Sequence, residues 1–267
     1  MDPRLPPLPP SDALAQLLPP DVDLDVGWRH EAARPVWLGV VWGRLGRGDL
    51  AHAHLDRVRL PTLWPWVAAE RGRLLRELGL HDRAEALEFP ALVQATDPVD
   101  EVMLRVSLTA DAVGAGDVDR AVRRLAAARD ALTRCPEGPR LARQRLRYAW
   151  VDAEVAFLTG RRPTGDGLPV LGPDGEVVWP ADHRWGTTFH AAKGLLFGGV
   201  VTGEPRLLDL ATAQAPPVLR WAIELARADA GRAGALEAAR RAWATIVPPP
   251  GSADEVAATP AARRLAS

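Results

Sequence analysis

The chain has one cysteine, one lysine and no long hydrophobic run. Cys135 has no second cysteine to pair with, which excludes a secreted scaffold built on intrachain disulfides. The longest apolar stretch, around residues 194–201, is far shorter than the roughly 18 residues that a membrane-spanning helix needs. The first residues, MDPRLPPLPP, lack the basic and apolar regions of a signal peptide. These features predict a cytoplasmic protein with no membrane partner.

The chain also has no large excess of positive or negative charge. The net charge of −1 gives no overall field that would draw the protein to nucleic acid or to anionic lipid. Of the 33 basic residues only Lys193 is a lysine. The chain is rich in Ala, Pro, Gly and Arg together, which is typical of a bias in the coding sequence. The sequence therefore gives Lys193 no special role.

Catalytic and nucleotide-binding signatures are absent as well. None of the four serines lies in a Gly-x-Ser-x-Gly motif, and no glycine-rich phosphate-binding loop is present. Cys135 lies in a turn with no histidine tied to it by sequence, which favours a bland surface or half-buried thiol over a nucleophile. We therefore expect no catalysis and no cofactor.

What the chain does contain is a recurring helix–turn–helix pattern, at residues 45–53, 77–86 and 112–121. In each copy a glycine can end one helix in the left-handed conformation. An aspartate can then accept N–H bonds at the start of the next helix, and a small residue one turn later allows close packing. The pattern predicts antiparallel helical hairpins, with aspartates Asp49, Asp82 and Asp117 and small residues Ala53, Ala84 and Ala121.

This pattern resembles the tetratricopeptide repeat, whose unit is a helical hairpin of about 34 residues. The resemblance covers about half of the chain. It implies an all-α fold of stacked antiparallel helical hairpins, an α-solenoid. The residues at the spacings of the family are Trp37, Gly48, Asp49, Ala53 and Pro65, then Gly72, Gly79, Ala84 and Ala91, then Leu108, Gly116, Ala121 and Ala128.

An irregular insertion interrupts the helices. Pro173-Asp174-Gly175 is a turn signal between two β-rich runs, so a short β-hairpin is expected on this loop. The predicted organisation is an extended proline-rich lead at 1–27, helical hairpins at 28–160, the inserted loop at 161–185, helical pairs at 186–247 and a flexible tail at 248–267.

The resemblance also implies a concave groove that receives a peptide or protein partner. Tryptophans mixed with arginines are typical of an interaction surface, with the aromatic side chains as anchors and arginines binding carboxylates or phosphates. We therefore predict a protein–protein interaction module. Its groove residues would be Trp42, Trp66, Arg73, Arg76, Arg147, Trp150 and Glu154.

Two alternatives stay open. Residues 120–147 hold nine arginines against one Asp and one Glu, a local net charge of +7. A nucleic-acid-associated or regulatory helical domain would use this segment, with Arg140 and Arg143 as anion-binding residues. The second alternative is an enzyme or metal site on the loop at 161–190, where Asp182, His183 and His190 cluster, although their spacing matches no zinc motif.

Overall fold

The computed structural model describes residues 34–161, 167–181 and 188–267. These ranges are mostly helical and contain one small antiparallel sheet, which confirms the predicted all-α fold. The predicted lead at 1–27 lies outside them. No helix in these ranges is both long enough and apolar enough to span a lipid bilayer. The elements are α2 (Arg34–Arg44), α3 (Gly48–Leu55), η1 (Pro61–Leu63), α4 (Trp64–Arg76), α5 (His81–Gln94), α6 (Pro98–Gly114), α7 (Val118–Leu132), α8 (Pro139–Leu158), β1 (Val170–Leu171), β2 (Val177–Val178), α9 (Thr188–Thr202), α10 (Pro205–Gln214), α11 (Pro217–Asp229), α12 (Ala235–Trp243), α13 (Ala253–Ala257) and α14 (Pro260–Ala266).

The predicted hairpins form at all three copies of the pattern. Helices α2 and α3, α4 and α5, and α6 and α7 pack against each other in pairs. A glycine in the left-handed region follows the end of each first helix; these are Gly46, Gly79 and Gly116, with φ of 79°, 82° and 74°. Such a φ is strained for any residue with a Cβ atom, so glycine fixes the place of each turn.

The predicted aspartate caps are right in one copy only. Asp117 accepts a hydrogen bond from the Arg120 backbone N–H at 2.9 Å and so caps α7. Asp49 instead binds the guanidinium of Arg47, at 2.7 Å. The N-cap positions of α3 and α5 make no side-chain cap bond. Asp49 and Asp82 lie not at the N-cap position but inside the first helical turn, where their negative charge still suits the positive end of the helix.

The first hairpin also differs from the prediction in which small residue is buried. Ala51, and not the predicted Ala53, is fully buried. The reason is that Gly46 ends α2, whereas Gly48 begins α3. A Cβ atom at Gly48 would lie 2.8 Å from the Val247 carbonyl oxygen, so this glycine permits a close backbone approach.

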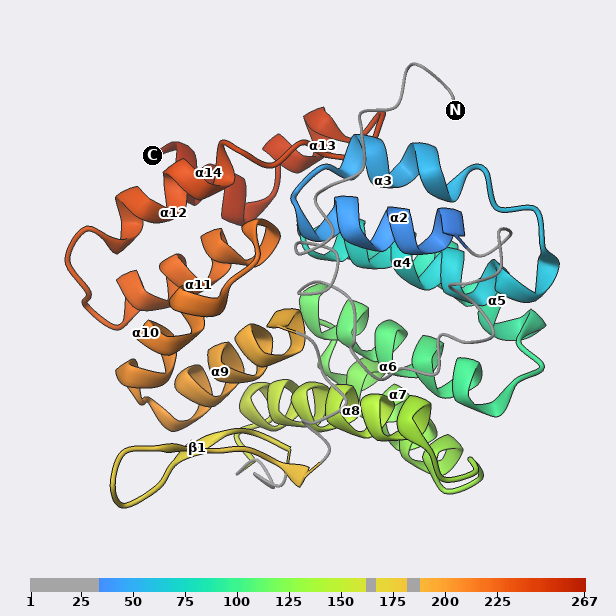
Figure 1. The fold of residues 1–267 in the computed structure, drawn as a ribbon, viewed down its shortest axis with the longest axis horizontal. Coiled ribbons are helices and arrows are strands. Elements are labelled where there is room, and N and C mark those ends of the chain that lie inside the picture. The colour runs from blue at the N-terminus through green and yellow to red at the C-terminus, as the bar shows by residue number, and fades with distance from the viewer. Residues whose placement is uncertain (1–33, 162–166, 182–187) are drawn as a thin grey trace.

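The hairpins follow one another around the middle of the molecule and close into a ring (Figure 1). Helices α2, α4, α6, α8, α9 and α11 contact each other in that order, and α11 returns to contact α2. Two backbone hydrogen bonds join the ends, from Gly48 N to Val247 O at 2.7 Å and from Val247 N to Gly46 O at 2.8 Å. The first helices of the hairpins therefore enclose a common space.

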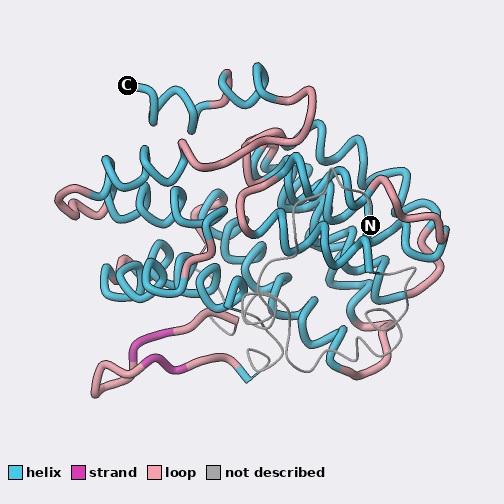
Figure 2. The backbone as a smooth tube through the Cα atoms, turned by 45° about the horizontal axis from the view of Figure 1, so that its top comes forward, coloured by secondary structure: helices cyan, strands magenta, loops and turns pink. Residues whose placement is uncertain are grey.

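The insertion carries the predicted β-hairpin. Strands β1 and β2 pair antiparallel, with Val170 opposite Val178 and Leu171 opposite Val177. The Gly175 N–H donates to the Gly172 carbonyl across the turn, at 2.9 Å. The hairpin extends from one side of the helical body (Figure 2).

The C-terminal segment is not the flexible tail that the sequence predicted. It forms helices α13 and α14, and α14 packs against α12. Thr259 caps α14 by accepting a hydrogen bond from Ala262 N at 3.3 Å, and Pro260 occupies the first helical turn. Ala262 and Leu265 are buried. A short amphipathic helix with a good cap therefore covers this part of the ring.

Candidate functional site

The enclosed space holds a cavity of about 560 Å³, and every helix of the inner ring contributes to its wall. The wall combines aromatic side chains with buried charges. The aromatic residues are Trp37, Trp66, Trp150, Phe189, Phe197 and Trp221, the cations are Arg44, Arg73, Arg76, Arg143, Arg147 and Lys193, and the carboxylates are Glu70, Glu77 and Glu154.

Most of the groove residues that the repeat register assigns meet in this cavity. Trp66, Arg73, Arg76, Arg147, Trp150 and Glu154 all line it, although they come from two different helices. Trp42 is absent from the wall and packs beside the core cluster of α2, α3 and α4. Val40 and Arg44 of α2 face the cavity in its place. Arg143, from the alternative set, is also in the wall, whereas Arg140 is not.

Arg73 is neutralised by carboxylates of its own helix. Its Nε atom lies 2.9 Å from Glu70 Oε1, and its Nη1 atom lies 2.5 Å from Glu77 Oε2. Burial opposes the charge of Arg73, but attraction from Glu70 and Glu77 outweighs it and raises the pKa of Arg73 above its ordinary range. Arg73 therefore has no excess charge for a ligand.

Arg76 is held by two buried carboxylates behind the cavity wall. Its guanidinium donates to Asp111 Oδ1 and to Glu88 Oε1, both at 2.7 Å. Burial, aided by repulsion from Asp111 and opposed by Arg76, raises the pKa of Glu88 to about 8. Gly72 makes room for the Glu88 carboxyl group, which a Cβ atom at that position would overlap. This network anchors α4 to α5 and α6.

Arg143 is buried without compensation. The side chain lies on α8, and the residue is only 7% exposed. Within the described ranges its Nε and Nη2 atoms have no hydrogen-bond partner. Burial, followed by repulsion from Arg147 and Arg140, lowers the pKa of Arg143 to about 10. A guanidinium stays charged at neutral pH even so, which leaves two strong donors unsatisfied in the cavity wall.

Burial also lowers the pKa of two neighbouring arginines. Burial, followed by repulsion from Arg73, lowers the pKa of Arg44 to about 9. Burial, followed by repulsion from Arg76, lowers the pKa of Arg147 to about 10. Arg147 is hydrogen-bonded at 2.8 Å to Gln144 and at 2.8 Å to Ser107, which are both uncharged. This part of the cavity therefore carries an excess of positive charge.

Helix α9 supplies an aromatic and basic face to the same cavity. The Phe189 ring lies 4.8 Å from the Arg44 guanidinium carbon and 5.6 Å from that of Arg73. Cations over a ring face gain only about 0.5–2 kcal/mol, so the ring compensates the charge in part. Burial, aided by repulsion from Arg44, holds the pKa of His190 well below its ordinary value, so this imidazole is neutral at pH 7.

Sequence reasoning missed the contribution of α9. Phe189, Lys193 and Phe197 are spaced four residues apart and so lie on one face of the helix. That spacing was readable, but the sequence could not show that α9 follows α8 in the ring.

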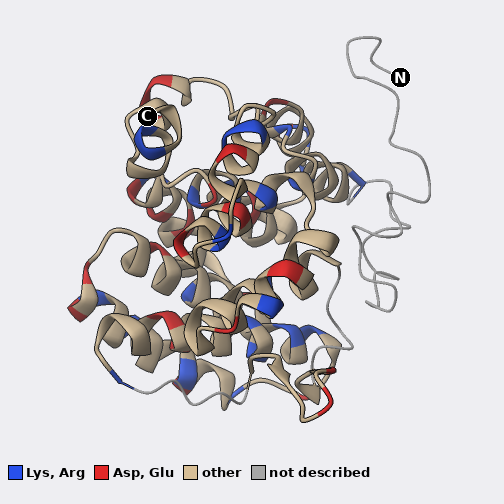
Figure 3. Cartoon of the chain, turned by 90° about the vertical axis from the view of Figure 1, so that its left-hand side faces the viewer, with Lys and Arg blue, Asp and Glu red and all other residues tan. Residues whose placement is uncertain are grey.

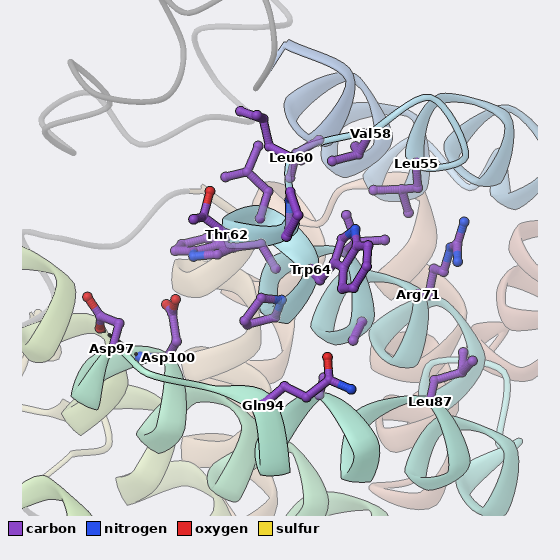
Figure 4. Close-up of a pocket in the computed structure, with 18 of the residues that line it drawn as sticks. Leu55, Val58, Leu60, Thr62, Trp64, Arg71, Leu87, Gln94, Asp97 and Asp100 are labelled. Atoms are coloured by element: carbon purple, nitrogen blue, oxygen red, sulfur yellow. Dashed lines mark hydrogen bonds between the residues drawn. The ribbon is translucent and has the colours of Figure 1, made fainter.

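A groove with a volume of about 1220 Å³ lies on the surface beside α4 and α5, and is called the surface groove below. Figure 4 shows Trp64, Leu60 and Leu87 around it, with Asp97 and Asp100 at one end. Trp64 is 51% exposed. Arg140 lies here and binds Asp100 Oδ1 at 2.6 Å and Asp97 Oδ2 at 3.1 Å. The charged groups at this end of the groove are therefore paired.

The arginine-rich segment does not form one basic surface. It divides between α7 and α8, and basic and acidic residues are interspersed along the helices in the view of Figure 3. Arg140 lies in the surface groove, and Arg143 and Arg147 lie in the cavity. Several others bind carboxylates, in the pairs Arg120–Glu85, Arg124–Glu85, Arg134–Glu101 and Arg145–Glu137.

The second alternative, an enzyme or metal site on the loop at 161–190, lies only partly within the described residues. Asp182 and His183 lie outside the described residues. His190 lies in the first turn of α9 and lines the central cavity. Within the described ranges no group of three His, Cys, Asp or Glu side chains is arranged to hold a metal ion.

Comparison of the chain with family models, curated proteins and solved structures gives no match. The resemblance to tetratricopeptide repeats therefore stays a prediction from the sequence.

Proposed function

We propose that this protein binds a small molecule that carries a carboxylate or phosphate group, in the central cavity of its helical ring. The observation that carries the proposal is Arg143, which is 7% exposed and whose Nε and Nη2 atoms lack partners within the described ranges. Leaving a buried charged donor unsatisfied costs more than about 1–3 kcal/mol. A bound anion would remove that cost, because carboxylate and phosphate oxygens match the fork of a guanidinium.

The rest of the wall supports the same ligand class. Arg44 and Arg147 add positive charge beside Arg143, and the aromatic side chains would contact an apolar body. Small-molecule sites are apolar cavities of roughly 300–1000 Å³ with a few placed polar groups, and the volume of about 560 Å³ lies in that range. The volume of the cavity therefore favours a small ligand.

A protein or peptide partner and a cytoplasmic location stay predictions of the sequence. The feature that favours a protein partner is the surface groove, where Trp64 is 51% exposed and Leu60 is 41% exposed. Aromatic anchors of this kind are typical of protein interfaces. Affinity capture with Trp64→Ala as the comparison tests it, and a partner retained equally by both proteins contradicts binding at this groove.

Thermal melting with inorganic phosphate and with succinate tests the cavity proposal. A ligand present at about one hundred times its Kd stabilises the folded state by about 2.7 kcal/mol. We expect at least one of the two anions to raise the Tm above that in chloride of equal ionic strength, and Arg143→Gln to abolish the rise. Arg123→Gln is the matched control on the exposed face of α7 and should respond as the wild type does. An equal response in all three proteins contradicts the proposal.

A further inference from the structure

We propose that Lys193 forms an imine with the carbonyl group of the ligand, so that the cavity takes small anionic aldehydes or keto acids. This inference rests on the proposed function, because the arginines would hold the anionic group while the lysine reacts. Lys193, to which the sequence composition gave no special role, would then be the reacting residue.

The position of Lys193 supports this role. The residue lies on α9 and lines the cavity together with Arg143 and Arg147. Its Nζ atom lies 5.9 Å from the centre of the Phe189 ring and 5.7 Å from that of Phe197. Within the described ranges the ammonium group makes these aromatic contacts and no hydrogen bond or ion pair. The amine is therefore accessible to a molecule in the cavity.

Charged groups from two helices face this amine. Burial lowers the pKa of Lys193, with attraction from Glu77 and Glu154 opposing the shift and repulsion from Arg76 and Arg147 adding to it. The same burial raises the pKa of Glu154, and Lys193 opposes that shift. A larger fraction of neutral amine is present than at the surface, and the neutral amine is the nucleophile.

The chemistry needs no further reactant. The nitrogen lone pair attacks the carbonyl carbon and gives a carbinolamine. Loss of water then forms the C=N bond, and the carbonyl oxygen leaves with the two amine protons. Glu154, whose pKa is raised by burial, lies in the same wall and can pass a proton to the departing oxygen and take one back from the nitrogen. The step is reversible and redox-neutral.

The contrast between this single lysine and the many arginines of the chain supports the proposal. Among the described residues, arginine supplies every other cation of the cavity wall, and a guanidinium binds carboxylates bidentately. A guanidinium cannot form an imine with a carbonyl group under these conditions, because it stays protonated. The one lysine of the chain lies where the excess charge of the arginines would bring an anion.

Reductive trapping provides the test. The full chain is incubated with glyoxylate and sodium cyanoborohydride, which reduces an imine to a stable secondary amine, and peptide mass mapping locates the adduct. Because Lys193 is the only lysine, the N-terminal amine is the internal reference. We expect modification of Lys193 at least roughly tenfold faster in the native protein than in urea, because the cavity holds the reacting groups together. Inorganic phosphate should slow it, and Lys193→Arg should show only the N-terminal adduct.

The outcomes separate the two proposals. Stabilisation by phosphate or succinate that depends on Arg143, without an adduct at Lys193, overturns this inference and leaves the anion site intact. Equal rates at Lys193 in native and unfolded protein overturn it as well. An adduct at Lys193 that phosphate and Arg143→Gln both slow supports it. Because the main readout uses the wild-type chain, a folding defect in Lys193→Arg does not affect the conclusion.

Discussion

Replacing Arg143 with methionine should stabilise the protein in the absence of ligand. Burial and repulsion lower the pKa of Arg143 to about 10 from its ordinary 12.5. At 1.36 kcal/mol per unit, that difference corresponds to a penalty of about 3 kcal/mol on the charged form. Because the folded-state pKa is the lower one, the penalty is fully present at every pH below about 10 and is relieved only above it.

Methionine has a similar length and no charge, so it removes this penalty and keeps contacts with the cavity wall. Replacing even a buried ion pair with apolar residues of similar volume is often neutral or stabilises proteins by about 1–4 kcal/mol. We expect a gain of about 1–3 kcal/mol in the free energy of unfolding. For a chain of this size that raises the Tm by roughly 3–10 °C.

The assay is urea denaturation and calorimetry at pH 7 in chloride buffer free of phosphate and carboxylates. Arg123→Met is the control, since the exposed position should change stability by less than about 0.5 kcal/mol. If Arg143→Met is instead less stable than the wild type by 1 kcal/mol or more, Arg143 has compensation that the structure does not show. The reasoning for an anion site would then be refuted.

Four further variants test the surroundings of the site. Gly72→Ala should destabilise the fold by about 1–3 kcal/mol in urea denaturation, because a methyl group there overlaps the Glu88 carboxyl group; no loss would contradict the placement of Glu88. The pKa of Glu88 is raised to about 8 from an ordinary 4.5, so the wild-type protein should lose stability as pH rises through that interval. Glu88→Gln should flatten this part of the pH profile, and an unchanged slope would show that Glu88 ionises normally. Trp150→Ala should lose about 3–5 kcal/mol since Trp150 is 3% exposed, whereas Trp64→Ala should lose less than about 1 kcal/mol; similar losses would contradict the assigned burial.

The local parts of the fold could be predicted from the sequence. Turns at Gly79 and Gly116 follow from the conformational demands of a helix end, and the β-hairpin follows from the turn signal at Asp174 and Gly175. The repeat register also placed Trp66 and Arg147 on the inner side of their helices. It failed for Trp42, because α2 ends two residues earlier than the register assumes.

The parts that depend on distant contacts could not be predicted. Closure of the ring rests on hydrogen bonds between Val247 and the α2–α3 turn, which join residues about two hundred positions apart. The sequence could not show that Arg76 is neutralised while Arg143 is not, because the carboxylates that bind Arg76, Glu88 and Asp111, come from α5 and α6. Arg143 lies three residues from Arg140, yet Arg143 lines the central cavity and Arg140 lines the surface groove.

A crystal structure of the protein soaked with selenate would show whether the central cavity binds an anion. Selenate has the shape and charge of a small oxyanion, and the anomalous signal of selenium locates it without ambiguity. We expect a selenium peak in the central cavity, with oxygens within hydrogen-bond distance of Arg143 Nε and Nη2. Peaks confined to surface arginines, with the cavity free of anion at a concentration that saturates them, would contradict it.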